Sequence, residues 1–209
     1  MMLHRIPLWF QRLFPDYIWQ IPSRERNIYL TFDDGPIPDV TEWVIEILDQ
    51  YDIKASFFVV GENVSKNPDV FNALIEKGHL VGNHTYHHVR GWQTPTPTYL
   101  EEVELCNKVM LSHGGQLPRY FRPPHGRIKP GQARILREQY RLLMWNVLTA
   151  DYDRSLNEEK CLKNSIRATQ PGSIVVFHDS LKAEKNLRYV LPRYIEHFFD
   201  LGYSFQPLP

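Results

Sequence analysis

The amino-acid sequence predicts an α/β fold, a distorted (β/α) barrel with about seven parallel strands. Seven short apolar segments recur along the chain, and most of them lack the polar–apolar alternation of a strand that has one face in water. Segments with helical periodicity separate them. Repeated strand–helix units give parallel strands with right-handed connections, and about seven such units favour a closed or nearly closed barrel. A doubly wound open sheet is the alternative.

The strands are predicted where apolar residues run together. In chain order these segments are 28–32, 55–60, 80–82, 120–121, 142–147, 173–177 and 203–205.

Helices are predicted between the strands. The first begins near Thr41, and the second covers 68–77 and stops at Gly78, since glycine readily takes the left-handed conformation that ends a helix. Two capping boxes, in which the side chains of a helix start satisfy each other's backbone donors, predict two further starts. These boxes are Thr98 with Glu101 and Ser155 with Glu158, and the remaining helices are 130–139 and 192–201.

Composition indicates a globular protein without an affinity for polyanions. Hydrophobic residues make up 43% and charged residues 23% of the 209 residues. The 24 basic and 24 acidic residues cancel, so neither nucleic acid nor an anionic membrane is an expected partner. No apolar run reaches the roughly 20 residues of a membrane span. Cys106 and Cys161 show no metal or redox spacing and are expected to be free thiols.

Two regions are expected. Residues 1–26 form an aromatic, apolar extension that packs on the domain, with a weak interfacial anchor as the alternative, and 27–209 form a single domain. Polar residues interrupt the extension, so it lacks the apolar core of a signal peptide and the default location is the cytoplasm. We expect a monomer.

Polar residues that can carry out chemistry follow five of the predicted strands. Because the carboxyl ends of parallel strands meet at one face, these side chains are expected to converge. The segments concerned are Asp33 and Asp34, 84–88, 122–126, Asp151 with Asp153, and His178 with Asp179.

The spacing of His84 and His88 predicts a metal site. Histidines four residues apart can share one face of a helical turn and bind one ion. With one carboxylate of the Asp33–Asp34 pair they leave positions open for water and substrate, as in catalytic zinc sites, and the second carboxylate is free to act as a base. Two histidines and a carboxylate also describe a non-haem iron oxygenase, which leaves the remaining residues without roles.

Two further residues complete the expected chemistry. Arg122 has the shape to hold a carboxylate, and the rigid Pro-Pro-His-Gly segment after it can point a backbone N–H at a developing oxyanion. His178 at a strand end is placed as a general acid.

The motifs in this order resemble those of the polysaccharide deacetylases of carbohydrate esterase family 4, the NodB homology domain. The resemblance covers about 28–205, in the order TFDDG, HTYHH, RPPHG, a degraded fourth motif WNVLTADY, and VVFHD.

The resemblance implies removal of N-acetyl groups from a glycan that contains N-acetylglucosamine, of the chitin-oligomer or peptidoglycan type, in a bacterium. It implies Asp33 as the base, His178 as the acid and the His125 N–H as an oxyanion donor. Arg122 would hold Asp33 and Asp151 would orient His178. The implied metal ligands are Asp34, His84 and His88, and the metal is zinc, with cobalt, manganese or nickel as alternatives.

The sequence departs from the family pattern where substrate is expected to bind. His125 replaces a tyrosine, Leu148 an aspartate, Tyr152 a tryptophan and Phe177 a leucine. The resemblance implies that Pro124, Trp145, Leu148, Tyr152 and Phe177 contact the substrate. A catalytically silent glycan-binding protein and an amidohydrolase acting on a small non-sugar amide are the alternative functions.

Overall fold

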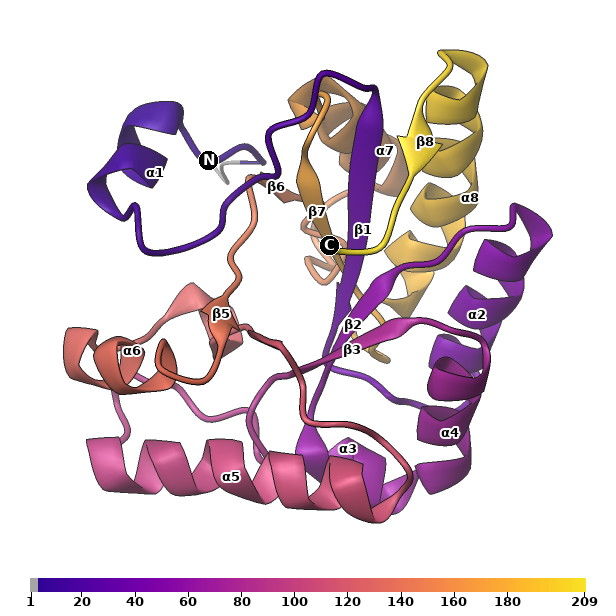
Figure 1. Cartoon of the computed structure of the whole chain (residues 1–209). Helices are drawn as coiled ribbons and strands as arrows, with labels where there is room; N and C mark the ends of the chain where they lie inside the picture. The colour runs from indigo at the N-terminus through magenta and orange to yellow at the C-terminus, as the bar shows by residue number, and fades with distance from the viewer. Residues whose placement is uncertain (1–3) are drawn as a thin grey trace.

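A computed structural model describes residues 4–209, which form one curled parallel sheet with helices around it (Figure 1). The sheet order is β5-β4-β3-β2-β1-β7-β6, and β8 pairs with the start of β1. This confirms the predicted α/β fold, a distorted (β/α) barrel with about seven parallel strands, which here form a curled half-barrel. The strands are β1 (Asn27–Asp33), β2 (Ser56–Val59), β3 (Leu80–Asn83), β4 (Tyr120–Phe121), β5 (Arg141–Leu142), β6 (Val147–Leu148), β7 (Ile174–His178) and β8 (Ser204–Phe205).

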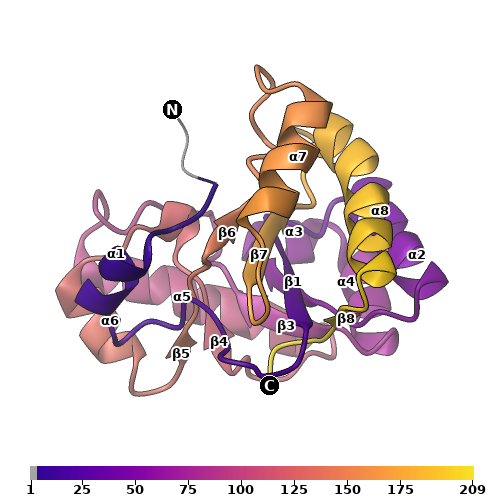
Figure 2. The ribbon, with the colours of Figure 1, turned by 90° about the horizontal axis from the view of Figure 1, so that it is seen from above.

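The helices lie outside the sheet, with α8, α2 and α4 on one side and α1 and α6 on the opposite side (Figures 1 and 2). They are α1 (Leu8–Leu13), α2 (Val40–Gln50), α3 (Gly61–Lys66), α4 (Pro68–Glu76), α5 (Thr96–Ser112), α6 (Pro130–Leu136), α7 (Glu158–Ala168) and α8 (Glu184–Asp200). None of the helices in residues 4–209 combines the length and the apolar character that crossing a bilayer requires.

Along the central strand β1, side chains face the helices and the interior of the curled sheet in alternation. Successive side chains of a strand point to opposite faces. Leu30 and Phe32 belong to the main apolar cluster beneath the helices, whereas Thr31 and Asp33 bond to an arginine inside the curled sheet. All of β1 after Asn27 is buried. The strand is therefore apolar toward the helices and carries polar groups toward the interior.

The predicted strand 142–147 is wrong, because two strands share that segment. β5 pairs with β4 and β6 pairs with β7, at opposite edges of the sheet, and residues 143–146 join them across the gap. An apolar run shows burial but not the partner of each residue, so the sequence could not reveal the split.

The N-terminal segment runs along this gap. The Ile6 N–H donates to the Asn146 carbonyl and the Ile18 N–H to the Leu142 carbonyl, both at 2.9 Å. Residues 1–3 of the predicted extension lie outside the described residues. The short helix α1 leaves Trp9 65% and Leu13 64% exposed, so its apolar side chains do not all pack on the domain.

Three predicted helix starts are wrong. Thr98 lies inside α5, which begins at Thr96, and α8 begins eight residues before Pro192, at Glu184. The cap of α7 is Asn157, whose side chain accepts a hydrogen bond from the Glu159 N–H at 2.9 Å. Asparagine and serine are nearly equal N-cap residues, so the choice between neighbours depends on the local loop.

Candidate active site

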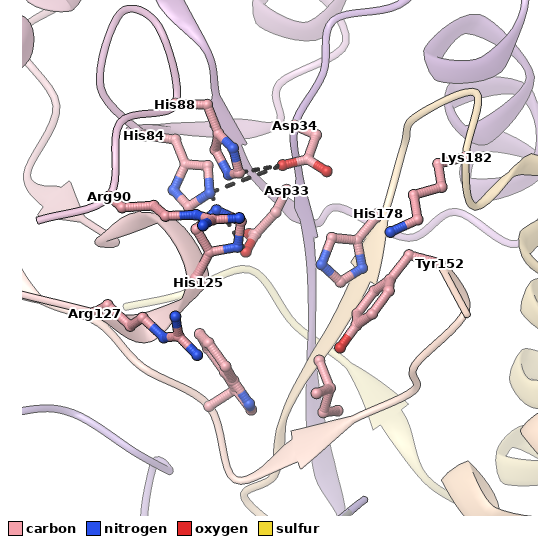
Figure 3. Close-up of a pocket in the computed structure, with 12 residues that line it drawn as sticks. Asp33, Asp34, His84, His88, Arg90, His125, Arg127, Tyr152, His178 and Lys182 are labelled. Carbon is pink, nitrogen blue, oxygen red and sulfur yellow. Dashed lines mark ion pairs between the residues drawn. The ribbon is translucent and has the colours of Figure 1, made fainter. Parts of the chain in front are cut away.

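A cavity of about 460 Å³ opens at the carboxyl ends of the strands (Figure 3). It brings together residues that lie up to 149 positions apart in the sequence, from Asp33 to Lys182. The sequence-predicted site residues that line it are Asp33, Asp34, His84, His88, His125, Trp145, Leu148, Tyr152 and His178. Arg122 and Asp151 lie buried behind them.

Two of the predicted substrate contacts do not line the cavity. Pro124 is buried beside it, and Phe177 is fully buried, where its ring stacks on Phe32 with 5.9 Å between centroids. Phe177 and His178 are neighbours on β7, so their side chains must point to opposite faces. The strand pattern of the sequence already contained that signal, and Phe177 does not line the cavity where the substrate is expected.

Asp34, His84 and His88 form a cluster that can hold a metal ion. One ligand atom from each lies within 4.8 Å of the others. His88 Nε2 is 3.3 Å and His84 Nε2 is 4.0 Å from the same Asp34 oxygen. The two histidines follow β3 in a loop and not on a helical turn, since Thr85 and His88 both have positive φ angles.

The surroundings of His84 fit a metal ligand. Its Nδ1 lies 2.7 Å from the Arg122 carbonyl, which accepts the Nδ1 proton and leaves the lone pair of Nε2 facing the cluster. Burial, with a smaller effect of His88, holds the pKa of His84 well below its ordinary value near 6.5. A neutral imidazole is the ligand form, so this donor set fits a divalent metal such as zinc.

Asp33 is held by an arginine that has no contact with water. Arg122 is 0% exposed and donates through one nitrogen to Asp33 Oδ1 at 2.5 Å and to Thr31 Oγ1 at 2.9 Å. Its guanidinium also lies over the Phe58 ring, 4.1 Å from the centroid. The second oxygen of Asp33 faces His84, at 3.9 Å from Nε2. Asp33 is thereby fixed with one oxygen turned toward the metal cluster.

Asp151 holds His178 from two sides. One oxygen lies 2.8 Å from His178 Nδ1 and the other accepts the His178 backbone N–H at 2.8 Å. Burial lowers the pKa of His178, but the charge of Asp151 and its hydrogen bond outweigh burial and raise it to about 9. His178 is therefore a protonated acid at neutral pH, with Nε2 free to face the cavity.

We expect Asp151→Asn to move the alkaline limb of the kcat pH profile to lower pH. The wild-type acid loses its proton as pH rises through about 9, and without the Asp151 charge the pKa falls back toward 6.5. Activity at pH 8 should drop more than activity at pH 6. The measurement is kcat from pH 5 to pH 10. Parallel losses at all pH values would contradict a role of Asp151 in the protonation of His178.

His125 lies beside the metal cluster, with its ring 4.7 Å from that of His88 between centroids. No other described residue accepts a hydrogen bond from its backbone N–H, and its φ of 59° is left-handed. Burial, with smaller effects of His88 and Arg90, lowers the pKa of its side chain to about 4. The neutral ring and the unused N–H leave this segment able to receive a developing negative charge.

Asp179, one of the polar residues predicted to converge at the strand ends, is buried and fixes the turn after β1. Its two oxygens accept the Gly35 N–H at 3.1 Å and the Thr41 hydroxyl at 2.6 Å. A Cβ at Gly35 would lie 1.9 Å from Asp179 Oδ2. This carboxyl group therefore requires glycine beside it and holds the backbone next to Asp34.

We expect Gly35→Ala to lower the free energy of unfolding by about 2–4 kcal/mol, because the added methyl must displace the buried, hydrogen-bonded side chain of Asp179. The matched control is Gly131→Ala on α6, where a Cβ meets nothing within 4 Å. That control should be neutral or stabilise by up to about 1 kcal/mol. Denaturant unfolding of the two variants checks the difference, and equal stabilities would contradict the close approach.

Three cations also line the cavity and were missed in the sequence: Arg90, Arg127 and Lys182. Each lies within four residues of a predicted motif, after His88, Gly126 and His178, so their position in the sequence was a signal that they could reach the site.

The chain belongs to the polysaccharide deacetylase family, whose family model matches residues 20–140. It is 30% identical over 165 residues to a peptidoglycan-N-acetylglucosamine deacetylase of Bacillus cereus, covering 78% of this chain and 60% of that protein. It is 32% identical to a chitooligosaccharide deacetylase of Bradyrhizobium sp., covering 75% of this chain and 72% of that protein.

Solved structures of other proteins share this fold. The Bc1960 peptidoglycan N-acetylglucosamine deacetylase superposes with a TM-score of 0.89 at 27% identity, over 98% of this chain and 95% of that chain. A mutant of BA3943, described as a carbohydrate esterase family 4 pseudoenzyme with restored activity, gives a TM-score of 0.82 at 26% identity, over 91% of this chain and 69% of that chain.

Proposed function

We propose that the protein is a metal-dependent hydrolase that removes N-acetyl groups from a glycan containing N-acetylglucosamine. The observation that carries this proposal is the arrangement of Asp33, the Asp34–His84–His88 cluster and His178 around one cavity. The names of the relatives, peptidoglycan and chitooligosaccharide deacetylases, support the class of substrate.

The residues divide the work of amide hydrolysis. Asp33, held by Arg122, takes a proton from the attacking water through its second oxygen. The His125 N–H donates to the oxyanion as the carbonyl carbon becomes tetrahedral. His178 then gives the proton on Nε2 to the departing amine, while Asp151 stabilises the imidazolium. A divalent metal held by Asp34, His84 and His88 would polarise the carbonyl and acidify the water.

Acetate release tests the proposal. The purified protein is incubated with N-acetylglucosamine oligomers and with peptidoglycan fragments, with chelator, and with zinc, cobalt, manganese or nickel added back. We expect release that stops with chelator and returns with metal. No release from any glycan with any metal would overturn the proposal.

The second candidate is a glycan-binding protein without turnover. The departures from the family pattern at His125, Leu148 and Tyr152, all of which line the cavity, favour it. The acid, the base and the metal-binding side chains are all present in this chain, which favours the enzyme. Binding of glycan without acetate release would decide for the binding protein.

A further inference from the structure

We infer that the cavity selects glycans that carry carboxylates on the sugars beside the N-acetylglucosamine to be deacetylated. This inference rests on the proposed function and adds the charge of the substrate to it. Arg90, Arg127 and Lys182 line the same cavity as the metal cluster and the acid–base pair (Figure 3). None of the three has a place in the hydrolysis described above.

The three cations are not neutralised by the protein. Among residues 4–209 none of them has an ion-pair partner within 4.0 Å. Arg127 lies over the Trp92 ring at 5.3 Å, and Lys182 over the Tyr152 ring at 5.1 Å. Such contacts hold a cation in place and keep its charge.

The acidic groups nearby have other partners. Asp33 is bonded to Arg122, and Asp34 belongs to the metal cluster. Asp153 acts on Lys182 only at a distance, and its carboxylate is bonded to the Ser155 hydroxyl at 2.7 Å. The whole chain has no net charge, so the excess of positive charge is a local property of this cavity.

The cations stand on both sides of the reacting groups. Arg90 and Arg127 lie on the side of His125, and Lys182 lies beyond His178 on the other side (Figure 3). Lys182 also lines a neighbouring hollow together with Arg154. A chain that crosses the cavity thus meets positive charge before and after the acetamido group.

This arrangement matches an acidic glycan better than a neutral one. A chitin oligomer has no charge to offer, so binding it would desolvate the cations without compensation. A polymer in which carboxylated sugars alternate with N-acetylglucosamine places an anion on each side of the reacting sugar. The guanidinium groups can then bind carboxylates in a bidentate manner.

A matched pair of glycans tests the inference on the metal-loaded protein. The first is a peptide-free tetrasaccharide of alternating N-acetylglucosamine and a sugar with an ether-linked carboxylate, and the second is the same molecule with its carboxyls converted to amides. We expect kcat/KM to be about tenfold higher for the glycan with free carboxyls, called the acid, than for the amide. Two exposed charge-assisted hydrogen bonds to the carboxylates account for a difference of this size. The ratio should shrink at 0.5 M salt. Equal values would overturn the inference.

Variants assign the effect to the three side chains. In the triple variant Arg90→Gln, Arg127→Gln, Lys182→Gln the acid-to-amide ratio should fall to about one. The control removes three exposed cations that do not line the cavity, on α5, α6 and α7: Lys108→Gln, Arg134→Gln and Lys160→Gln. The control should keep the wild-type ratio. A wild-type ratio in the first variant would overturn the assignment.

Two further arms separate this inference from the proposed function. Dissociation constants for the two glycans are measured with chelator present, so that turnover is not needed. Tighter binding of the acid without acetate release from any glycan would sustain the inference and overturn the proposed function. Acetate release with equal kcat/KM for the two glycans would support the proposed function and overturn the inference. If kcat/KM is higher for the acid than for the amide only when the glycans carry peptides, the recognised carboxylates lie on the peptide. That result would overturn their assignment to the sugars.

Discussion

Replacing His178 with alanine should lower kcat on an N-acetyl glycan by about 10²–10⁴-fold. The departing amine is a poor leaving group until it is protonated, and His178 is the group that Asp151 holds in its protonated form. The loss should fall on kcat more than on KM, because the proton moves only in the transition state. Steady-state kinetics on an N-acetylglucosamine oligomer measures both.

An aryl acetate provides the control for this prediction. Its phenolate leaves without a proton, so the loss caused by His178→Ala should be much smaller on the ester than on the amide. Metal content should match the wild type, because His178 is not in the metal cluster. An unchanged kcat on the amide would remove His178 from the mechanism. Equal losses on amide and ester would show that the substitution damages the site in general.

Replacing His84 with alanine should abolish tight metal binding and lower activity by about 1,000-fold. His84 is one of the three residues in the cluster that can hold a metal ion, and it is buried to 2% exposure, so alanine there removes one of the three possible ligands from the centre of the cluster. The activity figure corresponds to the loss of several kcal/mol of charge stabilisation. Zinc titration by calorimetry and the kcat of the metal-saturated variant measure the two effects.

The matched control is His87→Ala. His87 follows in the same loop, but its Nδ1 lies 2.9 Å from Glu102 Oε1, which turns the ring away from the cluster. This variant should bind zinc like the wild type. A His84 variant that retains wild-type zinc affinity would contradict the assigned ligands. Loss of zinc from both variants would show that the loop needs both histidines for its conformation.

Most of the polar residues in the candidate site could be predicted from the sequence, because they follow directly after the predicted strands. Asp33 and His178 each close a buried strand, and paired register then sets them side by side at the same level of the sheet. A local pattern of apolar residues followed by polar ones is enough to locate such groups. The same reasoning identified His84 and His88, although they meet through a loop with left-handed residues and not through a helix.

Other features depended on contacts between distant segments. The sequence offers no sign that Asp179 bonds to Gly35, 144 residues away, or that the run 142–147 divides between two edges of the sheet. Burial also overrode expectation for Phe177, which belongs to the apolar layer under the helices.

By itself, the sequence determined the parallel α/β architecture and the identity of most of the polar groups that line the candidate site. Both depend on local order: apolar runs make strands, and the residues that follow them lie at one face. The tertiary structure decided which residues surround those groups, including the burial of Arg122 against Asp33 and the bond between Asp179 and Gly35. These contacts join segments far apart in the chain, so they exist only once the sheet has curled and packed.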